Sequence, residues 1–467
     1  MISINVLPDD ALLEVFHFYV DESLHDDEEI NRKKEIEGWQ RLVHVCRRWR
    51  SVVFGSPRRL NLRLFCTANT LARDMVDVWP ALPILIRNYD LRAGDVDNVV
   101  ASLERSDLVR RISQIRFLQV SSSQLEVIWE AMQVPFPELT HLQFFLYDRT
   151  EPVLPRSGSF LGGSAPRLRS LTLYRIPYPG LPKLLSSAPH LTSLYLYSIP
   201  DSGYIPPEVM TACLSTLTSL ERLYLEFQLP RPLPDQEIQR RPPSIRTFLP
   251  VLDHFTFHGV GEYLEYLVAC IDAPRLSLLD ITYFNDIVFV IPQFTLFISH
   301  TPTLEAFDEA RVTLKDSTAS VELSSAYARL NVRIVCRELD WQLSFLEQVC
   351  TSSLPSLSTL HDLYISGRPW PQDWKDNIDY AQWLELLRSF SAVKNLYLSK
   401  ELAPCVVPTL QDLVGSRTTE AFPTLENIFL EEPQESGPVQ ESIGKFVATR
   451  QVTSQPVAVS RWDRGSK

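Results

Sequence analysis

Two histidines are the first candidates for chemistry in this sequence, because His254 and His258 have the i, i+4 spacing with which one helix face can hold a metal ion. The segment that contains them, DHFTFHG, alternates apolar and polar residues and therefore predicts a strand. On a strand, residues four apart share a face but lie roughly 13 Å from each other, too far to share an ion. We therefore expect no metal site at these histidines.

Patterns for other common kinds of catalysis are also missing. The sequence contains no H-E-x-x-H, no G-x-S-x-G, no P-loop and no cluster of histidine and cysteine at metal-ligand spacing. The segment GVGEYL, residues 259–264, approaches the glycine pattern of a dinucleotide-binding turn, but Leu264 stands at the third glycine position. The sequence predicts no cofactor and no enzyme, and a catalytic site assembled from scattered residues is the least favoured alternative.

Tyrosines at alternate positions of short apolar segments suggest binding rather than catalysis. In segments such as LYLYS and LYLEF, alternation on a strand places the leucines on one face and the tyrosines on the other. Tyrosine is enriched at protein interfaces because it offers rigid area and one polar tip, but it also simply suits strands, and the sequence does not separate these two explanations. The candidate protein-binding residues are Tyr174, Tyr195, Tyr197, Tyr224, Glu226 and His258.

Charge and composition narrow the possible partners and the compartment. With 45 Lys and Arg against 57 Asp and Glu, the net charge of −12 disfavours nucleic acid and anionic membranes. The most apolar stretch, residues 287–298, is interrupted by Pro292 and is shorter than the roughly 20 residues that a bilayer requires. Seven singly spaced cysteines and an N-terminus without a secretory signal pattern predict an intracellular protein of the cytoplasm, the nucleus or both.

A repeated phrase provides the elements that would position these residues. From about residue 135, Leu-x-x-Leu-x-Leu recurs, commonly after a proline, with spacings of 23 to 33 residues and one gap of 56 between Leu304 and Leu360 that could conceal a unit near Val332. Such a period is typical of leucine-rich repeats, in which each unit supplies one short parallel strand and a returning helix or loop. The first apolar anchors are Leu139, Leu168, Leu191, Leu220, Leu252, Leu276, Leu304, Leu360, Val393 and Leu425.

Helical segments are expected between several of these phrases, at residues 207–217, 262–270, 292–299, 380–390 and 409–414. The alternation of strand and helix predicts an α/β fold, a solenoid with its parallel strands on the concave face. Stacking of the repeats would create the core, because one unit cannot bury its apolar face alone. Residues 319–339 look like longer strands that fit the repeat poorly.

The N-terminus predicts a separate helical module. Pro8 can open a helix, Asp9 and Asp10 complement its positive end, and a helix is expected over residues 9–19 with Leu12, Val15, Phe16 and Tyr19 on one stripe. A second apolar stripe runs from Trp39 through Leu42, Val43, Cys46 and Trp49 to Val53. Between them, residues 21–38 are acidic and then basic. Helices this short require each other or a partner.

These two segments, LPDDALLEVF and WQRLVHVCRRWRSVVF, resemble the F-box, and the array that follows resembles the degenerate leucine-rich repeats found in F-box-like families of fungi. The spacer between the helices is longer than the compact pattern of that family. The resemblance implies a small helical bundle that binds a Skp-type adaptor and, through it, a cullin scaffold. The adaptor contacts or direct supports that it implies are Leu7, Pro8, Leu12, Leu13, Phe16, Val45, Cys46 and Trp49.

The resemblance implies the substrate-recognition subunit of a Skp/cullin/F-box ubiquitin ligase, with an unidentified target protein on the tyrosine-bearing repeats. The alternative is a leucine-rich-repeat binding scaffold without a ligase role, in which the helical module only caps the repeats. The expected domains are an F-box-like module at 1–65, a helical linker and cap at 66–134, irregular repeats at 135–432 and a polar C-terminal cap and tail at 433–467.

Overall fold

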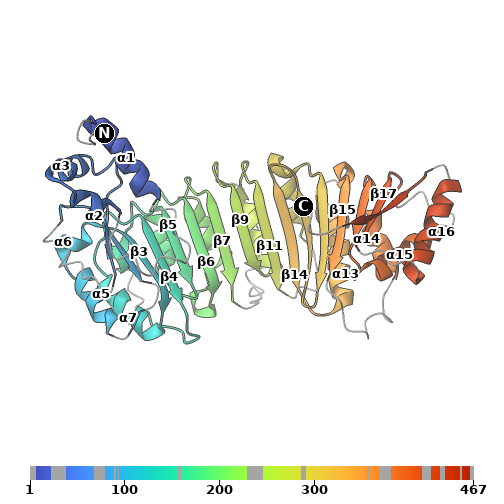
Figure 1. Cartoon of the computed structure of the whole chain (residues 1–467). Coiled ribbons are helices and arrows are strands. Elements are labelled where there is room, and N and C mark those ends of the chain that lie inside the picture. Colours follow the sequence, from blue (N-terminus) through green and yellow to red (C-terminus); the bar gives the residue numbers. More distant parts are fainter. Residues whose placement is uncertain are drawn as a thin grey trace. The chain divides into compact units, whose positions relative to one another are not determined.

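The chain has a mixed α/β fold in a computed structural model. The structure describes residues 7–22, 38–67, 79–88, 91–92, 94–154, 159–228, 246–284, 291–354, 357–367, 380–412, 422–431, 437–452 and 455–462. It divides into two compact units, Met1–Ala188 and Pro189–Lys467, and each is described by itself below (Figure 1). Most of the expected acidic and basic spacer lies outside the described residues.

The first unit begins with three helices and continues as a parallel sheet. The helices are α1 (Asp9–Glu22), α2 (Gly38–Val43) and α3 (Arg47–Gly55). The strands pair in chain order and are β1 (Leu64–Cys66), β2 (Ile84–Asn88), β3 (Ile112–Val120), β4 (His141–Leu146) and β5 (Ser170–Tyr174). The returning segments contain α5 (Asp95–Leu103), α6 (Ser106–Val109), α7 (Ser122–Ala131), the 3₁₀ turn η2 (Phe160–Gly163) and α8 (Leu181–Ser186).

Two expectations for this unit were wrong. The stripe from Trp39 to Val53 is not one helix, because the chain breaks at residues 44–46 and α3 starts afresh after Cys46. The region 66–134, expected to be a helical linker and cap, contains the parallel strands β2 and β3 in addition to the helices α5, α6 and α7. The strand-and-helix pattern therefore starts well before the first Leu-x-x-Leu-x-Leu phrase.

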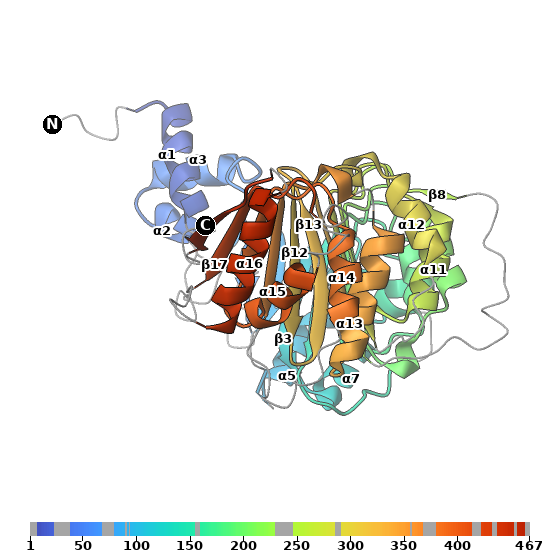
Figure 2. The same cartoon turned by 90° about the vertical axis from the view of Figure 1, so that its right-hand side faces the viewer.

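The second unit is a larger sheet with helices over one face (Figures 1 and 2). Its strands are β6 (Ser193–Ile199), β7 (Arg222–Phe227), β9 (His254–Gly259), β11 (Leu278–Phe284), β12 (Glu309–Lys315), β13 (Thr318–Ser324), β14 (Arg329–Val335), β15 (Asp362–Gly367), β16 (Asn395–Leu398), β17 (Asn427–Glu431) and β18 (Ala458–Trp462). A separate parallel pair joins β8 (Thr247–Phe248) to β10 (Ile271–Asp272).

Helices and short turns return the chain between these strands. They are η3 (Asp201–Gly203), α9 (Pro207–Leu214), α11 (Gly261–Cys270), α12 (Pro292–Ser299), η4 (Pro302–Leu304), α13 (Leu339–Gln348), the π-helical turn η5 (Val349–Ser353), η6 (Leu357–Thr359), α14 (Tyr380–Arg388), α15 (Ala403–Asp412) and α16 (Pro438–Val452). The prediction of helices at 207–217, 262–270, 292–299 and 380–390 is confirmed within a few residues, whereas α15 starts six residues before the expected 409.

Alternation along the strands explains the core of this unit. In β7 the side chains of Leu223 and Leu225 are buried under the helices, and those of Tyr224 and Glu226 point to the other face and stay partly exposed. The same alternation holds in β9 and β12. The anchor leucines therefore lie in the core as the repeat predicts.

The strand order departs from the chain order in one place. It runs β11-β14-β13-β12-β15, so that β14 pairs parallel with β11, β12 pairs parallel with β15, and β13 lies antiparallel between them. The segments that fit the repeat poorly are thus strands of the main sheet. Val332 lies in β14 opposite Ile281, which makes it the concealed strand position in the gap of 56 residues.

The C-terminal segment, residues 433–467, was expected to be a polar cap and tail. Instead, α16 spans fifteen residues, and β18 pairs in parallel with β17. This strand, with the sequence AVSRW, was not predicted because its side chains are largely exposed and show no apolar alternation.

Candidate protein-binding surfaces

The three N-terminal helices pack around aromatic side chains. Leu12, Leu13 and Phe16 are buried, and the rings of Phe16 and Trp49 lie 4.7 Å apart between centroids. The Sγ atom of Cys46 accepts a hydrogen bond from the Trp49 backbone N–H at 3.5 Å and caps α3. The buried residues therefore support the module rather than offer contact area, whereas Pro8, Val45 and Cys46 are exposed and Leu7 and Trp49 are half-buried.

Acidic residues of α1 form ion pairs with two arginines that follow α2 in the chain. Arg48 donates from Nη2 to Asp9 Oδ1 at 2.7 Å and also to the carbonyl of Leu7, which ties the start of α1 to α3. Arg59 pairs with Glu14 and lies 3.8 Å from Asp10. Arg48 and Arg59 are therefore used inside the module, and the acidic start of α1 has a structural role beside its effect on the helix dipole.

A second apolar face of α1 is exposed. At 100° per residue, Pro8, Val15, Phe18 and Tyr19 lie on one side of the helix, next to the buried side and away from Asp10 and His17, with Phe18 at its edge beside Glu14. The exposed fractions are 50% for Val15, 76% for Phe18 and 40% for Tyr19. The sequence reading placed Val15 and Tyr19 on the same stripe as Leu12 and Phe16, and it missed Phe18. The structure separates the two faces.

The tyrosines predicted in the second unit do come together. The rings of Tyr195 and Tyr197 are parallel with centroids 5.9 Å apart, and Tyr224 lies 4.2 Å from Tyr197. All three are partly exposed on the face of the sheet opposite the helices. Tyr174 belongs to β5 of the first unit, where it stacks on Phe145 at 5.3 Å. We call Tyr195, Tyr197 and Tyr224 the tyrosine patch.

Glu226 and His258 border this patch. Glu226 accepts hydrogen bonds from the Tyr224 hydroxyl at 2.9 Å and from Ser198 Oγ at 3.1 Å. Burial raises the pKa of Tyr224, and the negative charge of Glu226 raises it further, so the phenol stays protonated. The patch therefore offers rings and hydroxyl groups to a partner, not an activated nucleophile.

His258 should make the second unit sensitive to acid. Burial lowers the pKa of His258 below its ordinary value of 6.5, although Glu226 and Asp280 act in the opposite direction. As the pH falls below about 6.5, the unfolded chain therefore binds more protons at this histidine than the folded chain. The stability that the second unit has above that pH is partly lost on acidification. We expect the free energy of unfolding, measured in urea, to decrease less in His258→Asn than in the wild type when the pH is lowered from about 7.5 to about 5.5. His190→Asn, at an exposed position, serves as control, and an equal loss in all three proteins would contradict this role.

A second aromatic cluster lies outside the candidate protein-binding residues. Tyr364, Tyr397 and Phe429 stack along β15, β16 and β17, with centroid distances of 4.2 and 4.5 Å. Trp462 of β18 lies 5.7 Å from Tyr364, and the Arg311 guanidinium lies 4.7 Å from the Tyr364 ring centroid. Tyr364 is nearly fully covered, so this cluster stabilises the end of the sheet. The alternate positions were visible in the sequence, but Trp462 was assigned to the tail.

His254 and His258 lie on one strand as the sequence predicts. Among the described residues there is no group of three or more His, Cys, Asp or Glu side chains placed to hold a metal ion. In the same described ranges, no helix is both long enough and apolar enough to cross a membrane.

Comparisons with protein families and with curated proteins give no match. No protein-family model matches the chain, and no curated protein matches it either. Inferences about function therefore depend on the residues and contacts of the two surfaces described above.

Proposed function

We propose that the chain is the substrate-recognition subunit of a Skp/cullin/F-box ubiquitin ligase, and that it acts inside the cell. Three short helices are packed by Phe16 and Trp49 and leave the apolar side of α1 with Phe18 exposed. That exposed side is the single observation that carries the proposal, because an apolar helix face that the chain itself leaves open is an expected contact for another protein.

The repeats supply the other half of this function. Parallel strands with returning helices are the arrangement expected of a leucine-rich-repeat solenoid, and the tyrosine patch lies on the open face that such a solenoid offers to a target. In this role the chain performs no bond chemistry. It raises the effective concentration of the target near a ubiquitin-loaded enzyme that the cullin scaffold holds.

The test is the capture of a purified Skp-type adaptor by the full chain. We expect Phe18→Glu to weaken capture about thirtyfold or more, because it places a charge at the most exposed apolar side chain of this face. The fold should survive, since the Phe18 side chain is largely in solvent. His17→Glu introduces the same residue on the polar side of α1 and should bind like the wild type. Biolayer interferometry measures affinity, and circular dichroism checks the fold.

The outcomes separate the proposal from its alternative. If the wild type fails to capture the adaptor, or Phe18→Glu captures it equally well, the module does not use this face for a ligase. The protein would then be a repeat scaffold whose helices cap the first strands. Loss of binding in both variants would show that the effect is general charge rather than contact at Phe18.

A further inference from the structure

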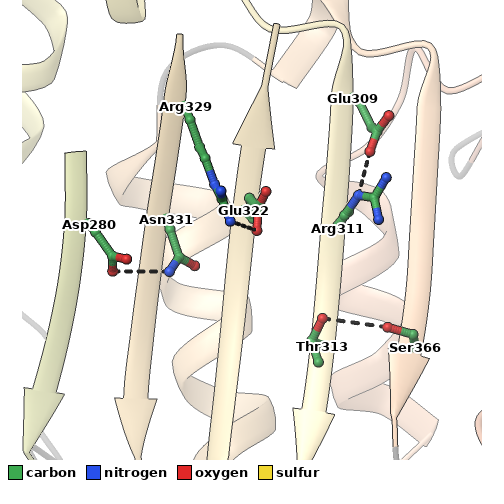
Figure 3. Close-up of polar contacts among 8 residues, drawn as sticks. All are labelled: Asp280, Glu309, Arg311, Thr313, Glu322, Arg329, Asn331 and Ser366. Atoms are coloured by element: carbon green, nitrogen blue, oxygen red, sulfur yellow. Dashed lines mark hydrogen bonds and ion pairs between the residues drawn. The ribbon is translucent and has the colours of Figure 1, made fainter. Parts of the chain in front are cut away.

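Five neighbouring strands of the second unit carry a strongly polar open face (Figure 3). In the order β11, β14, β13, β12 and β15, register places one outward residue of each strand in a common row. One of these rows consists almost entirely of hydroxyl groups. We call it the hydroxyl row, and it contains Thr282, Arg333, Ser320, Thr313 and Ser366.

The acidic residues within these strands lie in the two rows before it, and each has a partner. Asp280 accepts a hydrogen bond from Asn331 at 3.0 Å, and Glu322 pairs with Arg329 at 2.9 Å (Figure 3). Glu309 pairs with Arg311 at 2.5 Å, and Asp362 accepts from Asn395 Nδ2 at 2.7 Å. Two of these carboxylates thus pair with arginines of the face, and the other two accept hydrogen bonds from neutral amides.

Arg333 differs from those two arginines. Among the described residues its side chain has no ion pair and no hydrogen bond, although it is partly buried between Thr282 and Ser320 on the adjacent strands. A guanidinium offers five N–H donors in a fixed plane that matches a carboxylate or a phosphate. Lys315, exposed in the following row of β12, adds a second positive charge.

Thr282 provides an independent sign of a missing partner. The residue is only 4% exposed, and its buried hydroxyl oxygen has no hydrogen-bond partner. Leaving a buried hydroxyl unsatisfied costs free energy, so such a group calls for an explanation. Thr282 and Ser320 flank Arg333 on the two adjacent strands, each at the strand spacing of about 4.8 Å, so the guanidinium has a hydroxyl neighbour on either side with which it could share an anion.

We propose that the hydroxyl row binds an anionic side chain of the target protein, a phosphomonoester or a carboxylate, with Arg333 as the charged partner and a hydroxyl beside it, that of Thr282 or Ser320, as donor. The inference rests on the proposed function, because it identifies the substrate class of the same open face. In a chain of net charge −12, an uncompensated arginine among hydroxyls is a local site for an anion rather than part of a general attraction.

The position of the row suggests how a target segment would lie. Arg333 on β14 lies opposite Thr282 on β11, which lies opposite His258 on β9. His258 in turn lies opposite Glu226 on β7, and β7 pairs with β6, which carries Tyr195 and Tyr197 of the tyrosine patch. Four strand spacings correspond to about 19 Å, which an extended peptide covers with about six residues. A target segment with an apolar or aromatic side chain about six residues from its anionic group would reach both places.

Matched peptide arrays test this proposal on the full chain. The arrays share all residues except the central one, which is phosphoserine, glutamate or serine, and the best peptide is then measured by fluorescence polarisation. We expect the wild type to prefer an anionic centre about tenfold or more over serine. The phosphoserine and glutamate arms distinguish the two sources of the anion. Inorganic phosphate should compete if phosphoserine is preferred.

Two arginine variants of one strand provide the comparison. Arg333→Gln should weaken binding of the anionic peptide about tenfold to a hundredfold, as expected for one charge-assisted hydrogen-bonded pair, and leave the serine peptide unchanged. Arg329→Gln removes the same charge from the same face, where Glu322 already pairs with it, and should bind like the wild type. Arg333→Lys should keep part of the preference, because it retains the charge without the planar donors.

Several results would overturn the proposal. They are a wild type without preference for anionic peptides, an Arg333→Gln variant that keeps the preference, and an equal loss in Arg329→Gln. Thermal unfolding of each variant separates loss of binding from loss of fold. Adaptor capture is measured on the same proteins, so a failure of the ligase role with an intact anion preference remains distinguishable from the reverse.

Discussion

Replacing Trp129 by alanine should destabilise the first unit by about 3–5 kcal/mol, the range for removing a large buried aromatic side chain. Trp129 is fully buried in α7, with its indole stacked on Phe160 at a centroid distance of 3.7 Å and the edge of Tyr178 at 4.9 Å. It also contacts Phe144 of β4, so it joins the returning segment to the sheet. Alanine would leave a cavity between these elements.

Trp129→Phe is the matched variant and should cost much less, about 1–2 kcal/mol. The indole Nε1–H is buried without a hydrogen-bond partner, so phenylalanine removes volume and an unsatisfied donor at the same time. Hydrogen exchange of peptides from α7 and β4 measures the local stability, and Val127→Ala on the exposed side of α7 provides a surface control. Equal protection in Trp129→Ala and the wild type would show that this cluster does not hold the unit together.

The leucine pattern made much of the second unit predictable. Leu223 and Leu225 are buried while Tyr224 is partly exposed. This pattern was predictable because apolar and polar residues alternate along the strand in the local sequence. The bounds of α12 agree with the expected 292–299, since Pro292 marks its first turn. Tyr195, Tyr197 and Tyr224 could be grouped on one face for the same reason.

Partner choice between strands was not predictable by local reasoning. The sequence shows that residues 319–339 form strands, but it does not show that β14 pairs with β11 or that β12 lies two places further along. Those pairings depend on contacts between distant segments. The hydroxyl row depends on them too, because Thr282, Arg333 and Ser320 become neighbours only through this strand order.

Two further elements were not predicted correctly, because the apolar periodicity of the sequence either continued through a break or was too weak to show a strand. The apolar stripe from Trp39 to Val53 continues in register through residues 44–46, so periodicity alone predicts one helix where the chain forms α2 and α3. Cys46 is an unusual cap, which hid the break. In β18 the side chains are mostly exposed, so only pairing with β17 defines the strand.

Replacing Arg450 by alanine should destabilise the C-terminal part of the second unit by about 3 kcal/mol, from the cavity and the carbonyl groups left without donors. The residue is 1% exposed, and its Nη2 donates to the backbone carbonyl of Phe422 at 3.0 Å and to that of Leu425 at 3.4 Å. Nη1 donates to Gln455 Oε1 at 2.6 Å. One side chain of α16 thus joins the segments that precede β17 and β18.

The nature of the replacement separates hydrogen bonding from packing. Arg450→Met fills most of the volume and should cost about half as much, because it avoids the cavity but still leaves the carbonyls of Phe422 and Leu425 without this donor. Lys445→Ala removes an exposed partner of Glu441 on the same helix and should change stability by less than about 0.5 kcal/mol. Urea unfolding gives the change in stability, and hydrogen exchange in β17 and α16 locates it. If Arg450→Ala exchanged as slowly as Lys445→Ala in both elements, the carbonyls of Phe422 and Leu425 would not need this arginine, and the packing of α16 alone would hold the end of the sheet.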